Sequence, residues 1–371
     1  MILLFIFIIL LVCYSLLIFY YWKSWKSVPL FQPSEKQADI FLSVLIPARD
    51  EEENIGNLLA ALLEQTYPPH LYEIIVIDDH STDSTAAIAK TFRGVKVISL
   101  ENVGINSYKK MAIEKGIELA KGKVIITTDA DCIPPARWLE TIASFSQFSG
   151  ASFIVAPVVY RCNNQPFQVF QAMDFLVLQG ITAASVHRKI HAMCNGANLA
   201  YKKELFHEVG GFSGIDKIAS GDDMLLMQKI SKKFPDQIRY LKSADALVQT
   251  QPMPDWSSFF NQRIRWASKA RLYQDNKIKW VLILVYLFNL SFLFLAVAGF
   301  IDYYYWGILL AALAMKTLVE MPFFISVSTF FRMRWTAKYF FAFQPIHIFY
   351  TIVAGLLGQL GKYEWKGRRV K

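Results

Sequence analysis

Uncharged apolar runs stand at both ends of the chain. The first, Met1 to Trp22, carries no charged residue, and Lys23 and Lys26 follow it directly. As a helix, this run is long enough to cross about 30 Å of hydrocarbon. No basic residue precedes it and no small-residue cleavage pattern follows it, so we expect a retained anchor at 1–22 rather than a secretory signal peptide. The basic flank favours the cytoplasmic side for the residues that follow.

The second apolar region covers residues 280–361. It contains an uncharged run from Trp280 to Phe300 and another run from Tyr303 to Phe331. The latter holds one basic and one acidic residue, Lys316 and Glu320. Because these two residues are one helical turn apart, we expect them to pair inside a helix bundle.

A third stretch, from Tyr339 to Leu360, is apolar but is interrupted by Gln344, Pro345, His347 and Gln359. It either crosses the membrane or lies in the interface. Three crossings after a cytoplasmic domain would carry the basic tail, residues 362–371, to the outside. Basic segments usually stay on the cytoplasmic side, so either this stretch does not cross or one of the expected crossings is wrong.

Between these regions, residues 39–277 alternate short apolar runs with helical patterns. We expect strands at 41–46, 73–77, 95–100 and 124–128, and helices at 54–64, 84–92 and 109–120. This alternation is typical of an α/β domain with a doubly wound parallel sheet. In such sheets ligands bind at the carboxyl ends of the strands, and the acidic clusters of this chain come directly after the apolar runs.

Composition and charge agree with a membrane protein. Hydrophobic residues make up 54% of the chain, and its mean hydropathy is +0.30, which is too apolar for an ordinary soluble protein. The net charge is +9, but the basic clusters flank apolar segments, so anionic lipids explain them and we expect no nucleic-acid partner. The four cysteines are scattered without a CxxC pair, which fits a reducing compartment.

One acidic cluster has a direct chemical interpretation. Asp129-Ala130-Asp131 follows the apolar run at 124–127. Two unpaired carboxylates at the end of a buried strand are costly, so a functional role explains them better than chance. A divalent ion can neutralise the charge that grows on a diphosphate leaving group, and hard carboxylate oxygens suit Mg²⁺ or Mn²⁺.

As an ordered set, the polar motifs resemble those of the family 2 inverting glycosyltransferases, which have a GT-A fold. The motifs are Pro47-Ala48-Arg49-Asp50-Glu51, Val76-Ile77-Asp78-Asp79, Asp129-Ala130-Asp131, Gly221-Asp222-Asp223 and Gln262-Arg263-Ile264-Arg265-Trp266. The resemblance covers nearly all of residues 39–277. It implies an α/β GT-A domain, here with transmembrane helices at both ends of the chain.

On the donor side, the resemblance implies a nucleotide-binding turn and a metal ligand. It places Asp131 on the metal, and it places Pro47, Ala48, Arg49, Glu51, Asp78, Asp79, Lys109 and Asp129 around the nucleotide, its phosphates and the donor sugar. Simpler alternatives stay open for some positions. Glu51 can enrich a first helical turn, Asp83 can cap a helix, and Lys109 and its neighbour Lys110 can be surface lysines.

On the acceptor side, the resemblance assigns the general base to Asp223, because an acceptor hydroxyl must lose its proton as it attacks the anomeric carbon. The resemblance places Asp222 beside it on the acceptor or diphosphate side, and Asp222 can also cap the following helix. A sugar-facing amide is expected at Asn198. The remaining acceptor or diphosphate contacts fall on Gln262, Arg263, Arg265 and Trp266, a motif that also suits an interfacial amphipathic helix.

The sequence therefore predicts a multi-pass enzyme of the cytoplasmic membrane whose catalytic domain faces the cytoplasm. It would move a hexosyl or N-acetylhexosaminyl group from a nucleotide-diphosphate sugar, with a UDP-sugar as the expected donor, to a lipid-linked or saccharide acceptor with inversion. Two alternatives remain. One is a processive polysaccharide synthase similar to those that make cellulose or poly-N-acetylglucosamine, and the other is a membrane scaffold that binds nucleotide sugars without turnover.

Overall fold

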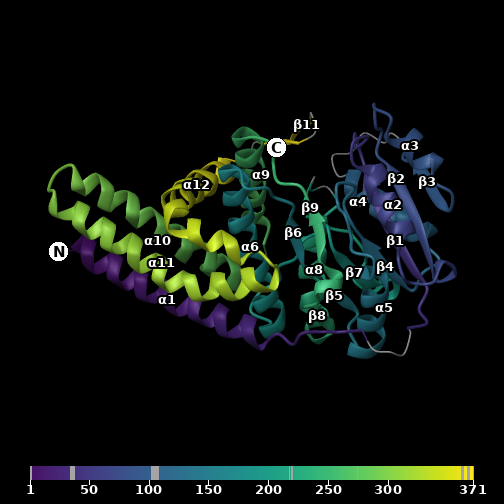
Figure 1. Ribbon diagram of the computed structural model, residues 1–371, viewed down its shortest axis with the longest axis horizontal. Coiled ribbons are helices and arrows are strands. Elements are labelled where there is room, and N and C mark those ends of the chain that lie inside the picture. Colours follow the sequence, from purple (N-terminus) through teal and green to yellow (C-terminus); the bar gives the residue numbers. More distant parts are fainter. Residues whose placement is uncertain are drawn as a thin grey trace. The chain divides into compact units, whose positions relative to one another are not determined.

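The computed structural model describes residues 2–33, 38–101, 108–216, 218, 220–273, 275–360, 363–365 and 368–370. The chain divides into two compact units (Figure 1). The sheet unit contains residues 28–161 and 192–251. The helical unit contains residues 1–27, 162–191 and 252–371.

The sheet unit is built on a mostly parallel seven-stranded sheet with the strand order β3-β2-β1-β4-β7-β5-β8. Only β7 runs antiparallel to its neighbours. The strands are β1 Leu42–Ala48, β2 Tyr72–Asp78, β3 Val95–Ser99, β4 Val124–Thr127, β5 Phe153–Val155, β7 Leu199–Lys202 and β8 Ile238–Tyr240. A separate parallel pair is formed by β6 Val158–Tyr160 and β9 Val248–Thr250. The predicted α/β class with a mainly parallel sheet is confirmed.

Helices flank this sheet and connect its strands (Figure 1). They are α2 Ile55–Leu63, α3 Thr85–Thr91, α4 Tyr108–Leu119, α5 Trp138–Ser149, α7 Lys203–Glu208 and α8 Asp222–Lys233, with 3₁₀ turns η1 Pro69–Leu71, η2 Pro235–Gln237 and η3 Ala244–Ala246. All seven strands and helices that the alternating pattern predicts between residues 41 and 128 are present. The central strands β1 and β4 are almost wholly buried, which explains their continuous apolar sequences.

One detail of the first strand differs from expectation. The sequence pattern predicts a strand that ends at Ile46, but β1 continues to Ala48, with Pro47 opposite Ile77 of β2. The pairing between β1 and β4 ends earlier, at Leu45 opposite Thr127. Pro47 therefore lies where one side of the strand has no ladder partner, and the missing N–H group removes no sheet hydrogen bond there.

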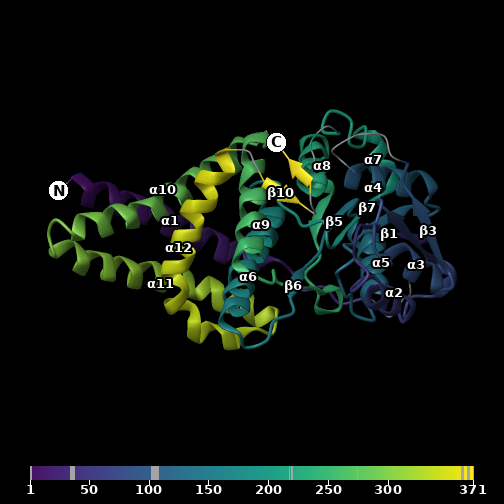
Figure 2. The same ribbon diagram turned by 90° about the horizontal axis from the view of Figure 1, so that it is seen from above.

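The helical unit consists mainly of long apolar helices. They are α1 Ile2–Ser27, α6 Pro166–Arg188, α9 Trp256–Ser268, α10 Asn276–Gly299, α11 Tyr304–Phe330 and α12 Phe340–Leu360, with 3₁₀ turns η4 Lys269–Leu272 and η5 Arg334–Tyr339. Helices α1, α10 and α11 run side by side (Figure 1). Helix α12 packs against α9 (Figure 2). Of the predicted basic tail, the structure describes only the hairpin of β10 Tyr363–Trp365 and β11 Arg368–Val370; residues 362, 366, 367 and 371 lie outside the described residues.

Five helical segments of the described chain are long and apolar enough to cross a membrane, namely α1, α6, α10, α11 and the segment Arg334–Leu360. Helix α6 falls inside the range 39–277 that the sequence pattern groups into one domain. The structure instead assigns residues 162–191 and 252–277 to the helical unit. Polar residues dispersed along α6, including Asp174, hide its apolar character in the sequence.

Helix α6 cannot cross a membrane, although its length and composition would allow it. The strands before it and after it belong to one sheet, because β7 pairs with both β4 and β5. A single crossing by α6 would place paired strands on opposite sides of the bilayer. In agreement, 83% of its apolar window is buried within the protein.

The predicted pair between Lys316 and Glu320 is confirmed. The Lys316 ammonium, which has no exposed surface, lies 2.6 Å from Glu320 Oε1 and also donates to Gln344 Oε1 at 2.6 Å. The Gln344 amide donates to the second oxygen of Glu320 at 2.6 Å, and the Tyr14 hydroxyl donates to the first. Each charged group is therefore paired and hydrogen bonded, as polar groups among apolar helices require.

Candidate active site

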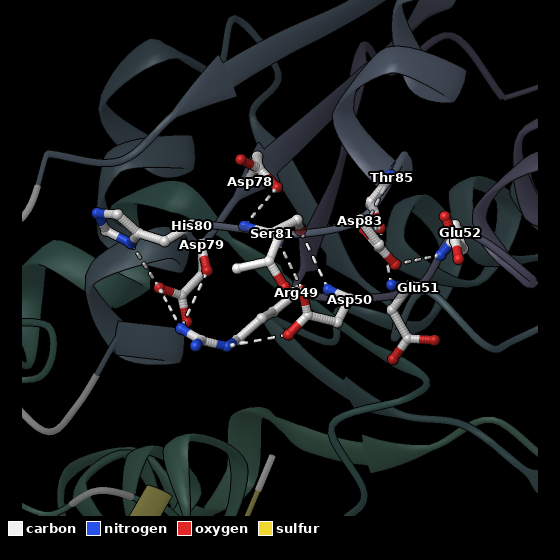
Figure 3. A network of polar contacts seen from close by, with 11 residues as sticks. Arg49, Asp50, Glu51, Glu52, Asp78, Asp79, His80, Ser81, Asp83 and Thr85 are labelled. Atoms are coloured by element: carbon white, nitrogen blue, oxygen red, sulfur yellow. Dashed lines mark hydrogen bonds and ion pairs between the residues drawn. The ribbon is translucent and has the colours of Figure 1, made fainter. Parts of the chain in front are cut away.

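The carboxyl ends of β1 and β2 carry the first two acidic motifs. In register, Ala48 lies opposite Asp78, so both strands end at the same edge of the sheet. The chain leaves β1 through Arg49 and Asp50, and Asp50 has a φ of 49°. This sharp turn brings the first motif against the loop that follows β2 (Figure 3).

Reciprocal hydrogen bonds tie these two loops together (Figure 3). The Thr82 N–H donates to Asp50 Oδ1 at 2.8 Å, and the Ser84 N–H donates to Glu52 Oε2 at 2.9 Å. In return, the Glu52 N–H donates to Asp83 Oδ2 at 3.0 Å. Asp83 also accepts the N–H of Thr85, the first residue of α3, at 2.9 Å, so its carboxylate serves the helix start as expected. These acids are engaged in holding the loops.

Glu51 differs from its neighbours. Its backbone N–H donates to Thr85 Oγ1 at 2.7 Å, but its side chain points away from the loop after β2 (Figure 3). The carboxylate accepts a hydrogen bond from Asn54 Nδ2 at 2.9 Å. Glu51 is therefore the acid of the first motif that is not engaged with the loop after β2. Its negative charge acts on the carboxylate of Asp131.

Asp78 and Asp79 are both buried, with 6% and 4% exposure. Asp78 Oδ1 accepts the Ser81 N–H at 3.4 Å. Asp79 Oδ1 lies 3.0 Å from His80 Nδ1 and 3.8 Å from Arg49 Nη1. Burial raises the pKa of Asp79, and His80 and Arg49 oppose that rise. Arg49 is thus held against Asp79 at the end of the strands.

Lys109 joins two motifs that are far apart in the sequence. Its ammonium lies 2.6 Å from Asp129 Oδ1, at the end of β4, and 3.6 Å from Asp222 Oδ2, at the start of α8. Burial opposes the ammonium charge, but Asp129, Asp222 and Asp223 outweigh this effect and raise the pKa of Lys109. Lys109 is therefore a charged residue of the acidic cluster and not a surface lysine.

The neighbouring Lys110 has a different role. It is buried and donates to the backbone carbonyls of Ile218 and, at 3.1 Å, of Ser220. It thereby holds the chain that leads to Gly221. Gly221 has a φ of 79°, which a residue with a Cβ rarely adopts, and this turn starts α8 at Asp222.

Asp131 is a further half-buried carboxylate of the same cluster. Its Oδ2 accepts a hydrogen bond from the Thr250 hydroxyl at 3.0 Å. Burial, followed by the charges of Asp129 and Glu51, raises the pKa of Asp131 to about 6, and the Thr250 hydrogen bond opposes the rise. A carboxylate that is held among like charges is a favourable place for a cation.

The residues present fit a divalent metal ion at Asp131. Its oxygens are hard ligands, and the surplus of negative charge from Asp129 and Glu51 favours a cation. Within the described ranges, no three or more acidic, histidine or cysteine side chains form a ready metal cluster. Mg²⁺ sites that serve phosphate substrates commonly use one or two carboxylates, with phosphates and waters as further ligands, so a complete protein cage is not required.

Asp223 is held by backbone donors on both oxygens. Oδ2 accepts the Gly196 N–H at 2.9 Å, and Oδ1 accepts the Met224 N–H at 2.7 Å. A Cβ built on Gly196 would lie 3.5 Å from both Asp222 Oδ2 and Asp223 Oδ2, so the Gly196 loop sits directly beside the acidic pair. Each Asp223 oxygen keeps lone-pair capacity for another donor, such as an acceptor hydroxyl.

The structure does not support the predicted sugar contact of Asn198. Its side chain has no exposed surface, and its oxygen accepts from Trp138 Nε1 at 3.0 Å. Its amide donates to the carbonyls of Pro157 and Ala246, each at 2.8 Å. Because every polar atom of the side chain is engaged inside the protein, we assign Asn198 a structural role in joining α5, the residue before β6 and η3.

The Gln262–Trp266 motif lies on α9 in the helical unit. Arg263 is buried, and its Nη2 and Nε atoms donate to Asp174 Oδ2 at 2.6 and 3.1 Å. Its Nη1 donates to Gln262 Oε1 at 2.6 Å, and its guanidinium covers the rings of Trp266 and Phe259 at 4.3 and 4.5 Å from their centroids.

This geometry corrects the predicted role of Arg263. A guanidinium that is buried, paired with a carboxylate and packed on two aromatic rings does not contact a diphosphate. Arg265 is half-buried, and in the part of the chain that the structure describes no carboxylate pairs with its guanidinium. Of the two arginines, only Arg265 keeps its charge available.

Sequence reasoning missed two polar residues that the structure places on predicted site residues. Thr250 contacts Asp131 from a strand 119 positions away. Asp174 pairs with Arg263, and the Tyr350 hydroxyl donates to its other oxygen. A lone acid within the apolar residues of α6 is a sequence signal for a buried partner, and it could have identified Asp174. No local pattern marks Thr250, because its contact depends on how the strands are ordered.

Comparisons with known proteins find similarity to glycosyltransferases in sequence and in fold. Residues 43–210 match the model of the family Glycosyl transferase family 2. The glycosyltransferase AglE of Haloferax volcanii is 30% identical over 187 residues, which cover 50% of this chain and 59% of that protein. The 4,4'-diaponeurosporenoate glycosyltransferase of Staphylococcus aureus is 29% identical over 183 residues, or 47% of this chain and 48% of that protein.

The chain thus spans about half to three fifths of the length of these relatives. Among solved structures, the mannosyltransferase PcManGT from Pyrobaculum calidifontis, in complex with GDP-Man and Mn²⁺, has a TM-score of 0.55 at 19% identity. The match covers 95% of this chain and 98% of that one, and it shows a GT-A-like α/β fold. Residues 43–210 are thus similar to family 2 glycosyltransferases, and the fold of the chain is similar to that of a solved mannosyltransferase.

Proposed function

We propose that this protein transfers a sugar, with inversion, from a nucleotide-diphosphate sugar to an acceptor hydroxyl at a membrane surface. The observation that supports this most directly is the position of Lys109, which lies within 3.6 Å of both Asp129 and Asp222. Within the sheet unit, one lysine therefore contacts both the Asp129–Asp131 motif, which suits the donor, and the Asp222–Asp223 pair, which suits the general base. Proximity of donor and base is what a direct displacement at the anomeric carbon needs.

Asp223 is the proposed general base. Its carboxylate is fixed by the N–H groups of Gly196 and Met224, at 2.9 and 2.7 Å, and can still accept the proton of an attacking hydroxyl. The attacking oxygen forms the bond to the anomeric carbon as the bond to the diphosphate breaks. The proton goes to Asp223, and the electron pair leaves with the nucleoside diphosphate.

The proposed donor site uses the edge formed by β1, β2 and β4. Pro47, Ala48, Arg49 and Glu51, with Asp78 and Asp79, would line the nucleotide, and Asp129 and Lys109 would lie toward the sugar and phosphates. Asp131 would hold Mg²⁺ or Mn²⁺, which when bound neutralises charge on the diphosphate. The Mn²⁺ in the mannosyltransferase structure, which holds GDP-Man, is in line with this assignment. For this protein we propose a UDP-sugar as the donor, as the resemblance of its motifs implies.

The apolar helices favour an acceptor that is lipid-linked or a saccharide at the membrane surface. We propose a multi-pass protein of the cytoplasmic membrane with the sheet unit in the cytoplasm, because Lys23 and Lys26 lie at the carboxyl-terminal end of α1. Helix α6 does not cross, so α1, α10, α11 and the segment Arg334–Leu360 remain as possible crossings. Arg265 and Trp266, on α9, would contact the diphosphate and the acceptor.

The experiment is a donor screen with purified, detergent-solubilised protein. Each nucleotide sugar is added with Mn²⁺ and a membrane lipid extract, and released UDP or GDP is measured. We expect one donor class to be turned over and Asp223→Asn to lower the rate at least 100-fold. Turnover by Asp223→Asn at the wild-type rate would refute the base assignment. A ladder of polymeric products from a labelled donor would favour a processive synthase over single addition.

A further inference from the structure

The short strand β9 supports the Asp129–Asp131 turn from the side. β9 pairs in parallel with β6, and Gln249 in its centre bridges to Ile133, two residues beyond Asp131. The Ile133 N–H donates to the Gln249 carbonyl at 2.7 Å, and the Gln249 N–H donates back at 3.0 Å. The next residue, Thr250, is thereby held at a fixed distance from the turn.

Thr250 contacts the Asp131 carboxylate directly. Its side chain is buried, and its hydroxyl donates to Asp131 Oδ2 at 3.0 Å. The other oxygen, Oδ1, receives the thiol of Cys132 at 3.7 Å, which is a weak donor. The strong hydrogen bond therefore falls on Oδ2. Oδ1 has only the weak thiol donor and stays available to a ligand that binds oxygen more strongly, such as a metal ion.

The residue after Thr250 reaches the second acid of the cluster through one intermediate. Gln251 Nε2 donates to Asn54 Oδ1 at 3.5 Å, and Asn54 Nδ2 donates to Glu51 Oε2 at 2.9 Å. The end of β9 thus contacts Asp131 directly and Glu51 through Asn54. Two consecutive residues, Thr250 and Gln251, therefore help to position both carboxylates.

We propose that Thr250 is a positioning residue for the cation site, which holds the Asp131 carboxylate in the orientation that binds a divalent metal. This inference rests on the proposed function, in which Asp131 is the metal ligand. Hydrogen bonds from neighbouring side chains orient metal ligands, and their loss commonly lowers metal affinity about 10- to 100-fold. Thr250 itself contacts neither metal nor substrate in this assignment.

Two substitutions separate the hydroxyl from the bulk of the side chain. Thr250→Val keeps the branched shape and removes the donor, and Thr250→Ser keeps the donor and removes a methyl group. Thr250→Ala provides a second variant without the hydroxyl if the valine variant does not fold. Thermal unfolding without metal identifies variants whose fold is impaired.

The readout is Mn²⁺ binding by the full chain in detergent, measured from the electron paramagnetic resonance signal of free Mn²⁺, with and without UDP. We expect Thr250→Val and Thr250→Ala to weaken Mn²⁺ binding about 10- to 100-fold, and Thr250→Ser to stay within about threefold of wild type. In turnover assays, the Mn²⁺ concentration for half-maximal rate should rise by the same factor, with kcat recovered at saturating Mn²⁺.

Asp131→Asn separates failure of this inference from failure of the proposed function. If Asp131→Asn loses Mn²⁺ and the folded hydroxyl-free variants bind it as wild type does, only the positioning role of Thr250 is overturned. If Asp131→Asn itself binds Mn²⁺ as wild type does, Asp131 is not the metal ligand and both proposals fail at this residue. An equal loss in Thr250→Ser and Thr250→Val would also overturn the role of the hydroxyl.

Discussion

The ammonium of Lys109 lies 2.6 Å from Asp129 Oδ1, and this ion pair distinguishes Asp129 from Asp131, the other carboxylate of the motif. Asp129 is already paired with a protein cation, whereas Asp131 receives a neutral hydroxyl from Thr250. Since a metal ion binds best where negative charge is not yet compensated, Asp131 is the better ligand of the two. Lys109 also approaches Asp222, so one residue links the acids of β4 and α8.

Replacement of Lys109 by methionine should therefore lower turnover strongly. It leaves Asp129, Asp222 and Asp223 as unbalanced like charges, and charge-assisted hydrogen bonds are worth about 1.5–3 kcal/mol. We expect kcat/KM for the donor to fall roughly 10- to 100-fold, measured as nucleotide release. The matched control is Lys115→Met on the same helix. Lys115 is 49% exposed and, among the residues that the structure describes, pairs with surface Glu118 at 3.0 Å, so turnover should change by less than about twofold.

The raised pKa of Asp131 predicts a dependence of stability on pH. Its folded-state pKa of about 6 lies above the ordinary aspartate value, so between these values the folded protein binds more protons than the unfolded protein and loses stability as the pH rises. Asp131→Asn should thus raise the thermal midpoint of the metal-free protein at pH 7.5. This gain should shrink as the pH falls through about 6 and be largely gone by about pH 4, where the folded carboxyl is protonated and the unfolded one is about half protonated.

The raised pKa of Asp131 also predicts how the affinity for Mn²⁺ changes with pH. A metal binds the deprotonated carboxylate, so Mn²⁺ affinity should rise with pH through about 6 and level off above it. Titration of free Mn²⁺ at pH 5, 6, 7 and 8 measures this. An affinity that is constant from pH 5 to 8 would contradict the assignment of Asp131.

The strands and helices up to residue 128 could be predicted because their apolar spacing is regular and each strand ends in a polar cluster. The pair of Lys316 and Glu320 was predictable for a similar reason, since both residues lie on one helix within one turn. The contacts of Lys109 with Asp222 and of Thr250 with Asp131 were not predictable, because they join segments more than 100 residues apart. The sugar contact predicted for Asn198 is not supported, because its side chain is hydrogen bonded to Trp138, Pro157 and Ala246, which lie far from it in the sequence.

The Lys316 network should be important for stability. Replacement of Lys316 by methionine leaves the buried Glu320 carboxylate without its cation, which typically costs about 3–5 kcal/mol. We expect a clear fall in the thermal midpoint in detergent. The double variant Lys316→Met with Glu320→Gln should recover much of that loss, because no uncompensated charge remains. Lys277→Met, at an exposed position at the start of α10, is the control and should leave the midpoint unchanged.

The two arginines of the α9 motif should respond differently to replacement by lysine. Lysine cannot reproduce the planar contact of Arg263 with Trp266 and Phe259 or its paired donation to Asp174, so Arg263→Lys should lower the thermal midpoint and, with it, turnover. Arg265→Lys keeps a charge at a half-buried position without a carboxylate partner in the described chain, so the midpoint should stay within error of wild type. If Arg265 contacts the diphosphate, the loss of bidentate donation should still lower kcat/KM about 10-fold. Unfolding curves and donor kinetics on both variants measure this contrast.

A stable Arg263→Lys variant with reduced turnover would instead place Arg263 at the diphosphate and contradict the structural role assigned to it.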